Sequence, residues 1–206
     1  METARYKLLS DSSSWLSELG AQPSDVETLK SAMIRVADEG LGALRERELA
    51  DSSAKDNVLE CRQVATAMSC DVKVINGDVW CQRLCSASGA ETVKSVDVIA
   101  PVEDVGGDWA LLVEGKMGTT SCRSPKIVDL EEKYTGTCAM LSRCHSRIIP
   151  VLYVIVSNNV LSYFRYRISR KMKGTHDVNM TACCLREFLE IVGIMPHDHL
   201  MSLSSH

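Results

Sequence analysis

The chain has 206 residues, of which 45% are hydrophobic and 24% are charged, and its net charge is -4. This composition excludes an intrinsically disordered chain, and the length fits one sizeable domain better than two. The first residues lack the apolar segment of a signal peptide, and the longest apolar run, residues 148–156, is too short to cross a bilayer. We therefore expect a soluble, intracellular protein with no membrane contact, in the cytoplasm, the nucleus or an organelle.

Residues 24–50 are predicted to form a helix. Ser24 is a capping residue, Glu27 stands at the capping-box position, and apolar residues recur behind them at helical spacing. The polar stretch 51–56 is predicted to be a connection, and residues 57–68 to form a second helix.

The periodicity then changes to that of strands. In residues 72–84, β-branched residues surround the Asn76-Gly77 dipeptide, which predicts a hairpin. Residues 93–102 and 109–117 are predicted to be two neighbouring strands, joined by a turn that contains two glycines.

The second half of the chain is predicted to close the sheet. Ser124, followed by proline, predicts the start of a helix over residues 125–146. Residues 148–157 form a nearly continuous apolar strand, as is typical of the centre of a mixed sheet. After an Asn-Asn turn, rings alternate with arginines in 161–171, which predicts a further strand, and 178–194 are predicted to form an amphipathic helix.

This order of elements predicts an α/β fold with a mixed central sheet flanked by helices. We expect residues 1–50 to form an N-terminal helical arm, residues 51–195 the α/β domain, and residues 196–206 a flexible tail. The arm is the predicted contact for a second copy of the chain or for a protein partner.

Three charged residues interrupt the two neighbouring apolar strands. Asp97, Glu114 and Lys116 would be costly to bury unless they pair or bind a metal. If the strands pair, the two carboxylates converge with the Gly115 carbonyl as hard oxygen ligands, which Mg²⁺ and Mn²⁺ prefer. Lys116 follows Glu114 by two residues, so it lies on the same strand face and would hold a water beside the metal. Such a site suits hydrolysis of a phosphodiester.

These residues resemble the PD-(D/E)xK nuclease superfamily. The segments DVIA, which begins at Asp97, and LLVEGK, which ends at Lys116, are similar in style to Holliday-junction resolvases and other restriction-endonuclease-like proteins. The resemblance covers residues 56–157, where the family's core of helix, three-stranded meander, helix and strand matches the predicted order. It implies a nuclease that acts on DNA or RNA, with Asp97 and Glu114 as ligands of Mg²⁺ or Mn²⁺ and Lys116 as the catalytic lysine. Glu60, on the first core helix, is the acidic residue available as an accessory ligand.

Other interpretations of the same residues stay open. Val96 stands where the motif has proline, and Gly115 stands where a β-branched or small apolar residue is usual. Asp104 or Asp108 would replace Asp97 if the register of the strands differed from the predicted one. The charged residues would also fit a surface salt bridge, and a catalytically inactive relative of this fold would serve as a scaffold that binds protein or nucleic acid.

The charge of the chain is unevenly distributed. Residues 143–173 contain basic residues and no acidic one, and Tyr163, Phe164 and Tyr166 offer ring faces for unstacked bases. The alternative is that the rings belong to the core and the arginines to a solvated face. The predicted nucleic-acid-binding residues are Arg165, Arg167, Arg170, Lys171 and Lys173.

The nine cysteines are predicted to be reduced thiols. An odd number cannot pair fully within one chain, and the chain lacks an export signal. Their spacing does not repeat the close pairs of a structural zinc site, so we expect them to pack as small hydrophobic residues.

Overall fold

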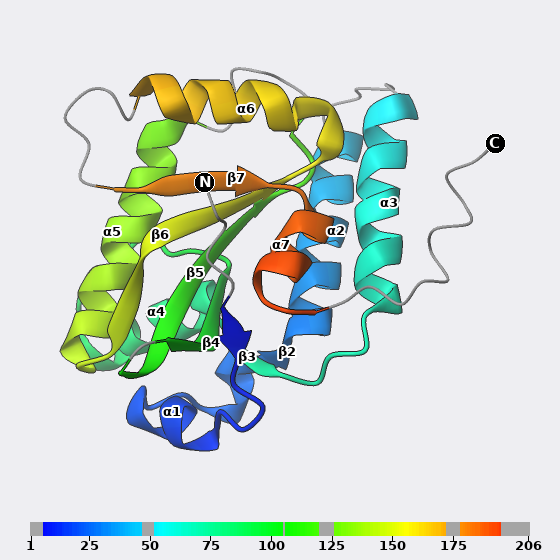
Figure 1. The fold of residues 1–206 in the computed structure, drawn as a ribbon. Coiled ribbons are helices and arrows are strands. Elements are labelled where there is room, and N and C mark those ends of the chain that lie inside the picture. Colours follow the sequence, from blue (N-terminus) through cyan, green and yellow to red (C-terminus); the bar gives the residue numbers. More distant parts are fainter. Residues whose placement is uncertain (1–5, 47–51, 105, 120–125, 172–177, 195–206) are drawn as a thin grey trace.

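A mixed sheet of seven strands lies between two layers of helices (Figure 1). The computed structural model describes residues 6–46, 52–104, 106–119, 126–171 and 178–194. The predicted α/β fold with a mixed central sheet flanked by helices is confirmed within these ranges.

The sheet combines an antiparallel half with a parallel half. Its strands are, in spatial order, β2 (Val26–Thr28), β3 (Lys73–Asn76), β4 (Val98–Asp104), β5 (Gly107–Lys116), β6 (Arg147–Val156) and β7 (Met180–Cys183), and β1 (Lys7–Leu8) also pairs with β4. Neighbours from β2 to β5 run antiparallel, whereas β6 and β7 run parallel to β5. The predicted hairpin of β4 and β5 and the predicted apolar strand β6 are both present.

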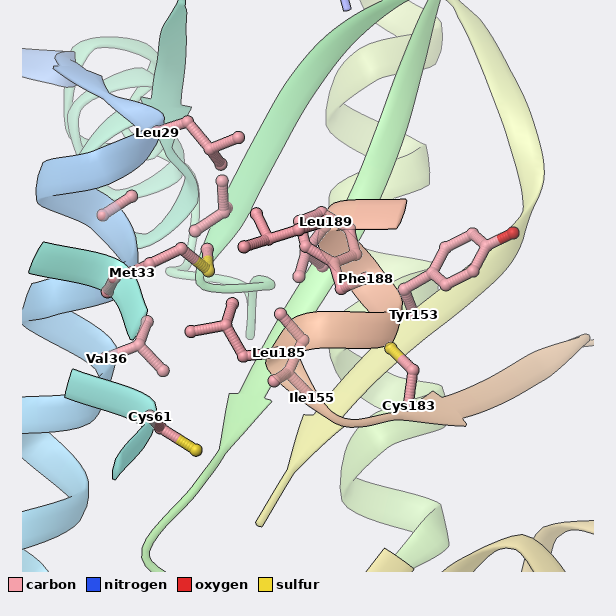
Figure 2. Close-up of a cluster of buried hydrophobic side chains, with 14 of the residues drawn as sticks. Leu29, Met33, Val36, Cys61, Tyr153, Ile155, Cys183, Leu185, Phe188 and Leu189 are labelled. Carbon is pink, nitrogen blue, oxygen red and sulfur yellow. The ribbon is translucent and has the colours of Figure 1, made fainter. Parts of the chain in front are cut away.

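The helices cover the two faces of the sheet and create two cores. They are α1 (Ser13–Glu18), the 3-10 helix η1 (Pro23–Asp25), α2 (Leu29–Glu46), α3 (Ser52–Ala67), α4 (Gly77–Ser88), α5 (Ile127–Arg143), α6 (Asn158–Lys171) and α7 (Leu185–Ile191). Because side chains alternate along a strand, Leu111 and Val113 of β5 join the core of α2, α3 and α7, and Leu112 joins that of α4, α5 and α6. Figure 2 shows the first core, where Phe188 of α7 lies beside Tyr153 of β6.

The predicted N-terminal arm, residues 1–50, is not separate from the sheet. Two of its segments are the strands β1 and β2, and α2 packs into the first core through Leu29 and Met33 (Figure 2). The helix begins later than predicted because residues 23–28 form η1 and β2 instead. Asp25 explains this difference, since its buried carboxylate pairs with Arg83 at 2.7 Å and fixes a turn before the helix.

The hairpin predicted over residues 72–84 is wrong. Asn76 is the last residue of β3. Its side chain caps α4 by accepting a hydrogen bond from the Val79 amide at 3.3 Å. Gly77 is the first residue of that helix, and its amide donates to the backbone oxygen of Asp97 at 3.2 Å. The dipeptide therefore joins a strand to a helix, because an asparagine is as good an N-cap as it is a turn residue.

Three further stretches differ from the predictions. Residues 158–171 form the helix α6, which buries Phe164 and Ile168 at helical spacing, so the strand predicted over 161–171 is wrong. The single helix predicted over 178–194 is instead the strand β7 followed by α7. The polar stretch 51–56 belongs to α3 from Ser52 onward.

The remaining predictions concern a helix cap, the C-terminal tail, the cysteines and membrane spans. The cap at Ser124 and the tail 196–206 lie outside the described ranges. All eight cysteines within the described ranges are free thiols. A search of the same ranges finds no helix with the length and apolar character that a membrane span requires.

Candidate functional site

The structure brings Asp97, Glu114 and Lys116 together at one end of the β4–β5 hairpin. Val98 pairs with Val113, so the residue before Val98 comes opposite the residue after Val113. Asp97 and Glu114 therefore point to the same face of the sheet. Both are buried, and the Glu114 side chain is 0% exposed.

A fourth residue, Lys133 of α5, completes an acid–lysine cluster with these three. Its ammonium lies 3.3 Å from Asp97 Oδ1 and 2.8 Å from Glu114 Oε1. Lys116 Nζ lies 2.5 Å from the same Glu114 oxygen. The cluster therefore balances two carboxylates with two ammonium groups. Sequence reasoning missed Lys133, although its position three residues after Leu130 and four before Thr137, both buried, places it on the inner face of α5.

The position of Asp97 is fixed from several sides. Its Oδ2 accepts a hydrogen bond from the Gly115 amide at 2.8 Å, and its backbone oxygen accepts one from Arg35 of α2 at 3.1 Å. The register alternatives are wrong, because Asp104 and Asp108 lie at the opposite end of the hairpin, where Asp104 pairs with Gly107.

Gly115 has a packing reason for departing from the motif. A Cβ at this position would lie 1.9 Å from Cγ1 of Val36, so only glycine lets α2 approach the end of β5. A second close approach lies one turn further along α2, between Gly40 of that helix and Gly118, which follows β5. A Cβ on Gly118 would lie 2.4 Å from the Gly40 oxygen. These glycines bring α2 to the edge of the candidate site.

Burial and charge shift the protonation equilibria of the cluster. Burial and the neighbouring charge of Asp97 raise the pKa of Glu114, and the two lysines only partly oppose this. For Lys133, burial favours the neutral amine, but the charges of Asp97 and Glu114 outweigh burial and raise its pKa. Glu114 Oε1 is buried within ion-pair distance of both ammonium groups, yet neither contact has the angles of a hydrogen bond.

A cavity of about 410 Å³ opens beside the cluster, and we call it the site cavity. Its lining residues come from α2 (Val36, Glu39, Gly40, Ala43), from the end of β5 and the residues after it (Gly115, Lys116, Met117, Gly118, Thr119), from the start of α5 (Lys126, Asp129) and from Asp97. Asp97 and Lys116 thus face a space large enough for a phosphate group and water.

Glu60 does not join the cluster. It lies on α3, 3.5 Å from Arg186 of α7, and is not among the residues that line the site cavity. The helix nearest the strand ends is α2, whose Glu39 does line the cavity and pairs with Arg35 at 3.0 Å. The acidic side chains that helices bring to the site cavity are therefore Glu39 of α2 and Asp129 of α5 rather than Glu60, because α3 packs against α2 and α7.

The predicted basic residues lie on α6. Arg165 binds the Ala182 oxygen at 3.0 Å and Glu187 at 2.7 Å, so it holds α6 against β7 and α7. Arg167 lies over the Phe164 ring, with 5.6 Å to the ring centroid. Arg170 lies in the same way over Tyr166, at 5.8 Å. The side chain of Lys171 and all of Lys173 lie outside the described residues.

Comparison with known proteins adds no family to this description. No protein-family model, no curated protein and no solved structure matches the chain. In the described ranges, no group of three or more His, Cys, Asp or Glu side chains is placed to hold a metal ion. The chemistry of the site therefore has to be inferred from Asp97, Glu114 and the two lysines.

Proposed function

We propose that the chain is a divalent-metal-dependent nuclease of the PD-(D/E)xK type, which hydrolyses phosphodiester bonds in DNA or RNA. The observation that carries the proposal is that Asp97 lies opposite the buried Glu114 at the end of the β4–β5 hairpin, next to Lys116 and the site cavity. The order of α3, β3, β4, β5, α5 and β6 supports it, since it repeats the core that the resemblance implies, with α4 inserted after β3.

The residues present fit a divalent cation in number and kind. Mg²⁺ is usually held by one or two carboxylates, and water and substrate phosphates complete its coordination. Asp97, which lines the site cavity, and Glu114 would supply the carboxylates and Gly115 its backbone oxygen, with the ion taking the place of an ammonium group beside Glu114 Oε1. When bound, the ion would polarise the phosphate and make water more acidic at neutral pH.

The lysines have separate tasks in this proposal. Lys116 lines the site cavity, so its ammonium can turn from Glu114 to a phosphate oxygen or to the attacking water. Lys133 lies between the two carboxylates and neutralises their repulsion, which keeps them adjacent before the cation arrives. Arg35 holds the backbone of Asp97 in place.

A second candidate is a non-catalytic relative that acts as a scaffold for protein or nucleic acid. The observation that favours it is that both carboxylates already pair with ammonium groups. A cluster of this kind is also a way to bury charge without chemistry. In this case a cation would have to displace Lys133 or Lys116 and would gain little.

One experiment separates the two candidates. Purified protein is incubated with Mn²⁺ and with single-stranded, duplex and branched DNA and RNA, and the wild type is compared with Asp97→Asn, Lys116→Ala and the control Glu103→Gln. Glu103 is exposed and lies at the far end of the hairpin. The nuclease proposal expects cleavage that Asp97→Asn and Lys116→Ala abolish and Glu103→Gln preserves, with the melting temperature of each variant recorded. A wild type that neither cleaves any substrate nor gains thermal stability from Mn²⁺ favours the scaffold.

A further inference from the structure

A second hollow lies on the surface between the start of α5 and α6, and we call it the tyrosine groove. It has a volume of about 420 Å³. Its lining residues are Lys126, Ile127, Val128, Tyr163, Tyr166, Arg167 and Arg170. They combine rings and aliphatic groups with positive charge, and none of them is acidic.

The groove owes its composition to the helical conformation of residues 158–171. A helix presents residues at positions i, i+3, i+4 and i+7 on one face, and this is the spacing of Tyr163, Tyr166, Arg167 and Arg170. In the strand predicted there, alternation would have placed Tyr163 and Arg167 on one face and Tyr166 and Arg170 on the other. Both tyrosines stay exposed, Tyr163 to 43% and Tyr166 to 56%. Large rings gathered on an exposed surface commonly mark a binding site.

The geometry of the rings and cations suits unpaired bases. The centroids of Tyr163 and Tyr166 lie 6.4 Å apart, with 51° between the ring planes, so the rings offer faces in different directions. The guanidinium of Arg170 lies 5.8 Å from the centroid of the Tyr166 ring and donates to the Tyr166 hydroxyl at 3.5 Å, so a positive charge that can pair with a phosphate lies beside that ring. Stacking on rings needs bases that have left a duplex, whereas the phosphates of any strand meet the cations.

The tyrosine groove and the site cavity are neighbours. Lys126 lines both hollows, and the first turn of α5 separates them, with Ile127 and Val128 on the groove side and Asp129 on the cavity side. A nucleic-acid strand whose bases stack in the groove can therefore pass Lys126 to reach the cavity that Asp97 and Lys116 line.

We propose that the tyrosine groove binds the unpaired bases that adjoin the phosphodiester to be cut, so that the substrate is a single strand or the single-stranded flap of a branched nucleic acid. This inference rests on the proposed nuclease function, and it assigns the substrate class of the same site. The bases stack on Tyr163 and Tyr166, while Lys126 and Arg170 meet the backbone.

Binding measured without catalysis tests the groove independently of the nuclease proposal. Fluorescence anisotropy is recorded for a labelled oligothymidylate and for a duplex, in EDTA, with the wild type, Tyr166→Ala, Tyr163→Ala and the conservative Tyr166→Phe. Loss of one stacked base is expected to weaken oligothymidylate binding about 5- to 100-fold in either alanine variant, while Tyr166→Phe stays within about twofold. Alanine suits a helix at least as well as tyrosine, so these variants should fold.

The charge contribution is tested with a matched pair. Arg170→Gln is expected to lower the slope of log affinity against log salt by about 0.7, because one phosphate contact is lost. Arg143→Gln removes the same charge from the exposed last turn of α5, outside the groove, and should leave the slope unchanged.

Several results would overturn the inference. One is equal binding of oligothymidylate by the wild type and Tyr166→Ala. Another is a Glu-rich peptide that binds with the same dependence on Tyr166, or a dimer that only Tyr166→Ala dissociates. The two proposals fail separately. Cleavage of duplex substrate that Tyr166→Ala leaves unaffected would refute the role of the tyrosine groove but support the nuclease proposal. Tyrosine-dependent binding of oligothymidylate by a protein that cleaves no substrate would support the groove as a binding site but refute the nuclease proposal.

Discussion

Replacement of Lys133 by methionine tests the acid–lysine cluster most sharply. The change keeps an unbranched side chain, shorter by one atom, and removes the ammonium that lies 3.3 Å from Asp97 and 2.8 Å from Glu114. Removing one partner of a buried pair costs about 3–5 kcal/mol, and because Lys133 is 20% exposed we expect the lower end, about 3 kcal/mol at pH 7. For a chain of this size, that loss lowers the melting temperature by about 6–12 °C.

The free energy of unfolding that Lys133→Met loses should increase as the pH rises. The folded-state pKa of Glu114 is raised above its ordinary value of 4.5, so its contribution to stability is complete below that pH and is lost as the pH rises through the folded pKa. Without Lys133 the pKa of Glu114 rises further, because the favourable charge that opposes burial and Asp97 is gone. Lys133→Met should therefore destabilise the protein least near pH 4 and most at pH 7 and above.

Thermal unfolding from pH 4 to pH 8 measures this effect. Lys94→Met is the matched control, because Lys94 contacts the same helix through Asp129 and Glu132 but is exposed, and its loss should leave the melting temperature unchanged. The idea that Lys133 holds the two carboxylates together would be refuted if Lys133→Met lowered the melting temperature equally at pH 4 and pH 7. It would also be refuted if the variant lowered the melting temperature no more than the control does.

The other predictions concern metal binding, packing and capping. Calorimetric titration should detect Mn²⁺ binding by the wild type that Asp97→Asn abolishes, and binding that Asp97→Asn leaves unchanged would count against a cation site at Asp97. Gly115→Ala should cost about 1–3 kcal/mol in urea unfolding, since its Cβ would lie 1.9 Å from Val36, and Val36→Ala in the same chain should recover part of the loss. Asn76→Ala should cost about 1 kcal/mol by uncapping α4, and no change would indicate that the cap contributes nothing.

Strong local patterns are sufficient to predict the centre of the fold. The apolar runs of β4, β5 and β6 are typical of strands, and Gly106 and Gly107, at the turn from β4 into β5, favour a hairpin. For the same reason Asp97, Glu114 and Lys116 can be selected from the amino-acid sequence alone, because alternation along paired strands fixes which side chains share a face.

The errors arise where one local pattern fits two structures. Asn76-Gly77 suits a hairpin turn and a helix cap equally, and the neighbour that decides is Asp97, far along the chain, whose oxygen accepts the Gly77 amide. The alternation of rings and arginines around Arg165 favours a strand, but burial of Phe164 and Ile168 against β6 and β7 selects a helix.

The remaining parts of the site depend on tertiary packing. Lys133 reaches the carboxylates only because α5 crosses that end of the sheet, and Glu39 lines the site cavity only because Gly115 lets α2 come close. Glu60 is a candidate in the sequence because its helix precedes the strands, yet order along the chain does not determine which helix packs at the strand ends.

Cleavage of a flapped oligonucleotide in Mn²⁺, compared between the wild type and Lys116→Ala, decides whether the acid–lysine cluster is a nuclease site. Lys116 is 29% exposed at the edge of the cluster, so its truncation should leave the fold intact. The nuclease proposal predicts metal-dependent cleavage by the wild type that falls at least about 100-fold in the variant, the scale on which one positioned hydrogen-bond donor to the reacting group contributes. Cleavage at equal rates by the two proteins, or none by either, would contradict it.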